Sequence, residues 1–159
     1  MKLENREIVR LCHEQLNNGD LARALETFAA DASNHGIKVG REGYKMVLED
    51  IYATFPDWQF EIEEIVESGS SVIVRTRVRG THLGKGEFPV NGGMLVGVEP
   101  TGNSFEVQHI HWYKLRDGKI CEHYANRDDI GMMQQLGLLP SDEIPISANR
   151  FENKGENYV

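Results

Sequence analysis

The feature that most constrains the fold is a change of hydrophobic period at Pro56. Before Pro56, apolar residues recur every three or four positions, as in the run from Ile8 to Leu16. After it, Trp58, Phe60 and Ile62 alternate with polar residues. A helix buries one stripe at a period of about 3.6 residues, whereas a strand buries one face at a period of about 2. The order predicts helices followed by an antiparallel sheet, which is an α+β fold.

Three amphipathic helices are predicted before Pro56. Gly19 ends the first, because glycine tolerates the left-handed conformation, and Asp20 can cap the second with its carboxylate. Pro56 ends the third, because the residue before a proline is disfavoured in the helical region. The three apolar stripes are Ile8, Leu11, Cys12 and Leu16; Leu21, Ala24, Leu25 and Phe28; and Tyr44, Val47, Leu48, Ile51 and Phe55.

The segments after Pro56 show features that predict a bulge, a two-faced strand and a hairpin. The alternation slips at Glu63-Glu64, which predicts a bulge. In residues 71–80, Val72, Val74, Thr76 and Val78 share one face and Arg75, Arg77 and Arg79 the other, so one side is buried and one is exposed or forms an interface. The glycine-rich segment 84–104 fits a lid beside a site and a plain strand connection equally well. A hairpin over 105–127 and a short helix capped by Asp128 or Asp129 complete the order.

Composition limits the class of protein. Among 159 residues, 25 acidic and 17 basic side chains give a net charge of -8, which disfavours binding to nucleic acid or to an anionic membrane. The sequence has no apolar run long enough to predict a membrane span. Its first ten residues, MKLENREIVR, are too polar for a signal peptide. Two cysteines, Cys12 and Cys121, predict unpaired thiols in a reducing cytoplasm. We therefore expect a cytoplasmic protein with one domain over residues 1–140 and a polar tail over 141–159.

The hairpin HIHWYKLRDGKICEH, residues 109–123, holds three of the six histidines. If Asp117-Gly118 forms a two-residue turn, His111 pairs with Tyr124 and His123 points to the opposite face. If Arg116 joins a three-residue loop with Gly118 in the left-handed position, His111 faces His123 and His109 faces Ala125. A glycine at the third loop position favours the second form, but the sequence leaves both open.

Three imidazoles on one face predict a small-molecule pocket, because histidine exchanges protons near neutral pH. Structural, half-buried histidines are the alternative. A His₃ zinc site fits the His-x-His spacing, but no carboxylate is placed to orient the imidazoles, so we expect no metal and no cofactor. The candidate ligand-binding residues are His109, Tyr113, Ala125, Asn34, His35, Tyr52 and Trp58.

Three stretches carry a resemblance to a known family. EVQHIHWYKLRDGKICEHYANRDDIGMMQQLG, GVEPTGNSFEV and HGIKVGREGYKMVLEDIYATFPDWQFEIEEI resemble segments of the SnoaL-like polyketide cyclases. The resemblance implies the fold of nuclear transport factor 2, a cone-like α+β barrel with three helices on a curved sheet around an apolar cavity. It also implies an aldol closure without metal or cofactor, with a cavity aspartate as general acid/base. Family histidines correspond to His111 and His123, and a family aspartate to Asp128.

One position departs from that pattern. The family's catalytic aspartate falls two residues after the hairpin histidine, where this chain has Ala125. Alanine cannot transfer a proton, so the resemblance supports the fold more firmly than the aldol chemistry. A hydrolase with a carboxylate–arginine–carboxylate arrangement is disfavoured, because Arg127 and Asp128 would diverge on a strand.

We therefore predict a protein that binds a small, largely apolar carbonyl compound. As an enzyme it would be a cofactor-independent cyclase, isomerase or hydratase, with His111 as the main acid/base, His123 as its partner and Asp128 as a third candidate. The alternative is a non-catalytic ligand-binding or interaction module on the same fold. We also expect a homodimer through the face of Arg75, Arg77 and Arg79 or its neighbour.

Overall fold

The computed structural model describes residues 4–88 and 93–141 and has the predicted α+β architecture. The helices are α1 (Asn5–Asn17), α2 (Leu21–Glu26), α3 (Gly40–Thr54) and α4 (Asp129–Gln135). The strands are β1 (Phe28–Asn34), β2 (Ile37–Lys38), β3 (Gln59–Ser68), β4 (Ser71–Thr81), β5 (Ser104–Arg116) and β6 (Lys119–Arg127). The predicted polar tail lies outside the described residues, apart from Ser141.

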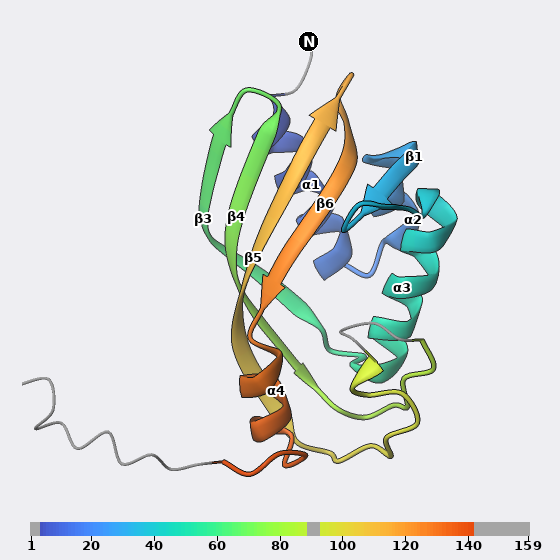
Figure 1. Cartoon of the computed structure of the whole chain (residues 1–159), viewed down its shortest axis with the longest axis vertical. Helices are drawn as coiled ribbons and strands as arrows, with labels where there is room; N and C mark the ends of the chain where they lie inside the picture. Colours follow the sequence, from blue (N-terminus) through green and yellow to red (C-terminus); the bar gives the residue numbers. More distant parts are fainter. Residues whose placement is uncertain (1–3, 89–92, 142–159) are drawn as a thin grey trace, which may run out of the picture.

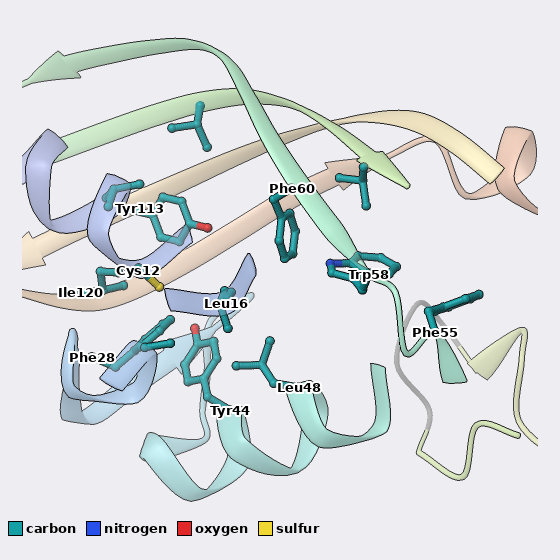
Figure 2. Close-up of a cluster of buried hydrophobic side chains, with 14 of the residues drawn as sticks. Cys12, Leu16, Phe28, Tyr44, Leu48, Phe55, Trp58, Phe60, Tyr113 and Ile120 are labelled. Atoms are coloured by element: carbon teal, nitrogen blue, oxygen red, sulfur yellow. The ribbon is translucent and has the colours of Figure 1, made fainter. Parts of the chain in front are cut away.

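The six strands form one curved sheet in the order β2-β1-β6-β5-β4-β3 (Figure 1). The core lies between this sheet and the helices α1 and α3, where apolar side chains from both layers meet (Figure 2). β5 alternates strictly between buried and exposed positions along its length, so one face supplies the core and the other faces outward. This alternation places the histidines of β5 on the inner face.

Local signals in the sequence set most of the element boundaries. The Asp20 carboxylate accepts a hydrogen bond from the backbone N–H of Arg23 at 3.1 Å and caps α2 as predicted. The predicted bulge in β3 is confirmed by a register shift between Ile62 and Glu64. Arg75 and Arg77 of β4 both form ion pairs with Glu63 on the outer face, as expected for an exposed side. None of the described helices has the length and apolar character that a membrane crossing requires.

The predicted stripe of the second helix was wrong at its end. α2 stops at Glu26, and Phe28 begins β1 instead of completing a helical face. β1 pairs in parallel with β6, so the sheet is not purely antiparallel. Thr27 makes the change of direction, since its hydroxyl donates to the carbonyl of Ala24 and its carbonyl accepts from the N–H of Ile120. This last contact is 93 residues apart in sequence, so no local pattern indicates it.

The hairpin between β5 and β6 adopts neither predicted arrangement in full. Asp117 and Gly118 have φ of 52° and 74°, so they form a two-residue turn of the type I′ class, and the favoured three-residue loop was wrong. A register shift next to Leu115 then adds one residue to β6. His111 therefore pairs with Ala125 and Tyr113 with His123. Because of the bulge, His123 returns to the inner face, which the two-residue turn alone would not allow.

Candidate functional site

A cavity of about 540 Å³ opens between the inner face of the sheet and helices α1 and α3. Its walls are mainly apolar and come from α1, β1, α3, β3, β5 and β6. The lining residues are Cys12, Leu16, Phe28, Asn34, His35, Gly43, Tyr44, Met46, Val47, Leu48, Ile51, Trp58, Phe60, Phe88, His109, His111, Tyr113, His123, Ala125 and Arg127.

Most of the predicted site residues meet in this cavity. The residues brought together are Asn34, His35, Trp58, His109, His111, Tyr113, His123 and Ala125. Two candidates are placed elsewhere. Tyr52 is not among the described lining residues, and its hydroxyl donates to the carbonyl of Leu16 at 2.6 Å. Asp128 is exposed and accepts a hydrogen bond from the N–H of Gly131 at 2.8 Å, which makes it the N-cap of α4.

A chain of three side chains joins β5, β6 and β1 in the cavity wall. His111 Nδ1 lies 2.9 Å from His123 Nε2, and His123 Nδ1 lies 3.1 Å from Asn34 Oδ1. The planes of the two imidazole rings are nearly parallel, with 15° between them. The backbone N–H of His35 also donates to the carbonyl of His123 at 2.9 Å, so the end of β1 is fixed against β6.

The chemistry of these groups fixes the direction of the hydrogen bonds. An amide oxygen only accepts, so His123 must carry its proton on Nδ1 and accept at Nε2 when it is neutral. His111 must then donate from Nδ1, which leaves a lone pair on His111 Nε2. That nitrogen is buried and has no hydrogen-bond partner among the described residues. An imidazole held in one tautomer by a second group is the arrangement that enzymes use for a general base.

Reasoning from the sequence missed His13, which lies next to this chain. His13 Nε2 is 2.9 Å from the Tyr113 hydroxyl, and its ring lies edge-on to His111 with centroids 5.9 Å apart. His13 belongs to the buried face of α1 together with Val9 and Leu16. This spacing of four and three residues was the available signal, but the predicted stripe of Ile8, Leu11, Cys12 and Leu16 did not include His13.

Burial keeps the imidazoles of the site neutral. It lowers the pKa of His13 to about 4. Burial, helped by the nearby Arg127 guanidinium, lowers the pKa of His109 to about 4. The pKa of His123 falls to about 3, and that of His111 falls well below its ordinary value, in each case mainly through burial and then through neighbouring histidines. Burial also raises the pKa of Tyr113 well above its ordinary value. Near neutral pH these groups therefore accept and donate hydrogen bonds without carrying charge.

Within residues 4–88 and 93–141, no three histidine, cysteine, aspartate or glutamate side chains are arranged to hold a metal ion. Cys12 and Cys121 are both unpaired thiols. Burial raises the pKa of Cys12 to about 11, so this thiol behaves as a small apolar side chain in the cavity wall.

Comparison with known proteins identifies the family of the chain. Residues 6–136 match the model of the SnoaL-like polyketide cyclases, which is most of the chain. The chain belongs to the SnoaL-like polyketide cyclase family. The resemblance found in the sequence motifs is thereby confirmed, together with the expected fold.

Named relatives support the same assignment. Nogalonic acid methyl ester cyclase of Streptomyces nogalater is 32% identical over 112 residues, which cover 69% of this chain and 76% of that protein. Aklanonic acid methyl ester cyclase DnrD of Streptomyces peucetius is 33% identical over 138 residues, covering 82% and 89%. The crystal structure of IdmH from Streptomyces antibioticus, described as a candidate polyketide cyclase, superposes with a TM-score of 0.69 and 31% identity, covering 85% and 99%.

This SnoaL-like protein has Ala125 at a central position of the cavity wall. Ala125 pairs directly with His111 across the β5–β6 ladder, and its backbone N–H donates to His35 Nε2 at 3.3 Å. The family resemblance places a catalytic aspartate at this position. A methyl group stands there instead, with the imidazole-bearing residues His111 and His35 beside it.

Proposed function

We propose that this SnoaL-like protein binds a small, largely apolar carbonyl compound and catalyses a cofactor-independent proton transfer on it. His111 acts as the acid/base, with His123 and Asn34 as positioning residues. This proposal rests on one observation: His111 lines the cavity, and its buried Nε2 has no hydrogen-bond partner among the described residues. The relatives named as methyl ester cyclases favour an intramolecular aldol cyclisation as the reaction.

In such a reaction His111 Nε2 takes a proton from a carbon that lies between two carbonyl groups. The resulting enolate carbon attacks another carbonyl of the same molecule, and a carbon–carbon bond forms. The new alkoxide then takes the proton back from His111 Nε2. No electron pair leaves the substrate and the proton is returned, so the reaction balances without a cofactor. During the step, His123 accepts the hydrogen bond from His111 Nδ1 and spreads the transient charge.

The lowered pKa of His111 restricts the substrate. A weak base removes a proton efficiently only from an acidic carbon, so the reacting carbon must be activated by two carbonyl groups or by a conjugated ring system. The same low pKa makes the protonated imidazole a strong acid, which favours return of the proton to the alkoxide. Polyketide-type compounds have such activated carbons.

The second candidate is a non-catalytic ligand-binding module. It is supported by Ala125, because the family's acid/base carboxylate is replaced by a methyl group at a residue that lines the cavity. Under this proposal the imidazoles only accept and donate hydrogen bonds to the ligand.

His111→Gln separates the two candidates, because glutamine keeps polar contacts but transfers no proton. We expect the turnover of a 1,3-dicarbonyl polyketide-like ester to fall by about 10²–10⁴-fold with little change in ligand affinity. His82→Gln is the control, because His82 is buried and does not line the cavity. If His111→Gln keeps full turnover, the assignment of His111 is wrong. If the wild type binds such esters but turns none over, the binding module is correct.

We also propose that the outer face of the sheet forms a homodimer. Ile110, Trp112 and Tyr124 are exposed on adjacent strands of this face, beside the arginines of β4. Tryptophan and tyrosine are favoured in interface centres. Light scattering of the wild type should give the mass of a dimer, and Trp112→Glu should give that of a monomer. A monomeric wild type would contradict the proposal.

A further inference from the structure

A second polar cluster lies in the cavity, apart from the His111–His123–Asn34 chain. It consists of Trp58, His109 and Arg127, which we call the donor cluster; all three line the cavity. His109 and Arg127 face each other directly across the β5–β6 ladder. The rings of Trp58 and His109 lie with centroids 6.3 Å apart. The residue just before β3, together with strands β5 and β6, thus brings one indole, one imidazole and one guanidinium to the same wall.

The buried members of this cluster lack hydrogen-bond partners. Trp58 and His109 are each 3% exposed. Neither Trp58 Nε1 nor His109 Nδ1 has a partner in the described part of the chain. An indole N–H only donates, and leaving it buried and unpaired costs free energy that a ligand acceptor would recover. Figure 2 shows the Trp58 nitrogen on the ring edge that faces the middle of the buried cluster.

The Arg127 guanidinium contacts the protein through its Nε edge only, as far as the described residues show. Its Nε lies 3.3 and 3.4 Å from the two carboxylate oxygens of Asp129. No hydrogen bond is formed by its two terminal nitrogens within the described residues. The Arg127 side chain is 26% exposed. One edge is therefore fixed and the other edge remains available to a ligand.

The charge of the cavity contrasts with that of the protein. The whole chain has a net charge of -8, yet none of the described lining residues is an aspartate or glutamate. Arg127 is the one arginine or lysine among the described lining residues, and burial lowers the pKa values of His109, His111 and His123. An apolar pocket with one cation strengthens the attraction to an anion, because little water screens it.

We propose that the donor cluster binds a free carboxylate of the ligand, so that this protein takes an acidic, largely apolar keto acid. The guanidinium of Arg127 pairs with the carboxylate, and Trp58 Nε1 and His109 donate to its oxygens. The inference rests on the proposed function, since it names the substrate class of the same cavity. It distinguishes this chain from the relatives described above, which are named for methyl esters.

The test compares an acid with its ester. 2-Naphthoate and methyl 2-naphthoate have the same apolar body and differ in the charge of one group, and calorimetric titration of the full chain gives both dissociation constants. We expect the wild type to bind the acid more tightly than the ester. Arg127→Gln should weaken binding of the acid by about ten- to a hundred-fold and leave the ester unchanged, because a charge-assisted pair is lost. Arg23→Gln removes the same charge from a side chain that is 71% exposed, and should change neither constant.

A second variant keeps the test valid if Arg127→Gln does not fold. Trp58→Phe removes the indole donor and keeps the charge, so it should weaken binding of the acid by several-fold and of the ester less. Circular dichroism checks that each variant is folded.

The outcomes separate this inference from the proposed function. Equal binding of acid and ester by the wild type, or an equal loss of both in Arg127→Gln, would overturn the carboxylate site and leave the role of His111 standing. His111→Gln should lose turnover and keep the preference for the acid. Binding of neither compound would contradict both the ligand cavity and the donor cluster.

Discussion

The buried imidazoles allow a test of the site that needs no substrate. His13 and His109 are 2% and 3% exposed, and the pKa of each is lowered to about 4 by burial. In the unfolded chain each should titrate near its ordinary value of about 6.5. Between these two pKa values, the unfolded state therefore binds protons at His13 and His109 that the folded state does not bind. The stability that the neutral groups contribute is fully present above about pH 6.5 and is lost as the pH falls toward about 4.

The size of the effect follows from the two pKa values. At about pH 5 both histidines are nearly fully protonated in the unfolded chain and mostly neutral in the folded chain. This difference lowers the free energy of unfolding by about 2 kcal/mol for each histidine. The titration of His13 and His109 together should lower the free energy of unfolding by about 4 kcal/mol between about pH 7.5 and 5. This is a large part of the stability of a typical domain. His111 and His123 act in the same direction, because their pKa values are also lowered.

Urea denaturation followed by circular dichroism measures this loss. His13→Gln isolates one group, because glutamine can still hydrogen-bond the Tyr113 hydroxyl but does not titrate. The wild type and the variant should differ in their free energies of unfolding by an amount that changes by about 2 kcal/mol between about pH 7.5 and 5, to the disadvantage of the wild type. Carboxylates titrate in both proteins and cancel in the difference. A difference that stays constant over this range would refute the buried, neutral imidazole at position 13.

Three further changes test other parts of the structure. Ala125→Asp places a carboxylate opposite His111 and should raise the pKa of that imidazole, because a nearby negative charge favours its protonated form; nuclear magnetic resonance titration would detect the rise, and an unchanged titration would show that the two positions do not interact. Asp128→Ala should cost about 1 kcal/mol in thermal unfolding and leave turnover unchanged, because it removes a helix cap; a large loss of turnover with normal stability would give Asp128 a catalytic role. Gly84→Ala would put a methyl group 1.8 Å from the carbonyl oxygen of Ala53, so it should lower stability by about 1–3 kcal/mol; an unchanged melting temperature would show that the segment yields without cost.

The order of α3 and the elements after it could be read from the sequence because it depends on local patterns, whereas β1 and β2, which lie between α2 and α3, were not predicted. The change of period at Pro56 separates α3 from β3, and the caps Asp20 and Asp128 act within three residues of their helices. The alternation in β4 fixed its buried face. The family motifs were likewise contiguous, and the family model confirms them over residues 6–136.

The site itself depended on contacts between distant segments. A single added residue near Leu115 returns His123 to the inner face, and an insertion of one residue in a ladder leaves no periodic signal in the chain. His13 and Asn34 reach the hairpin histidines only after α1 docks and β1 joins β6 in parallel. The convergence of Trp58 with Arg127 likewise requires β3 and β6 to curve around one cavity.

The sequence by itself thus determined the α+β class, the ends of α1 and α3, the exposed face of β4 and the resemblance to the SnoaL-like cyclases. Only the tertiary structure decided which nitrogen of His111 is left without a partner, and that Arg127 is the one arginine or lysine among the described residues of the cavity wall. The physical reason is one of range: periodicity and capping act over a few residues, whereas hydrogen-bond direction and burial depend on side chains brought together from four strands and a helix.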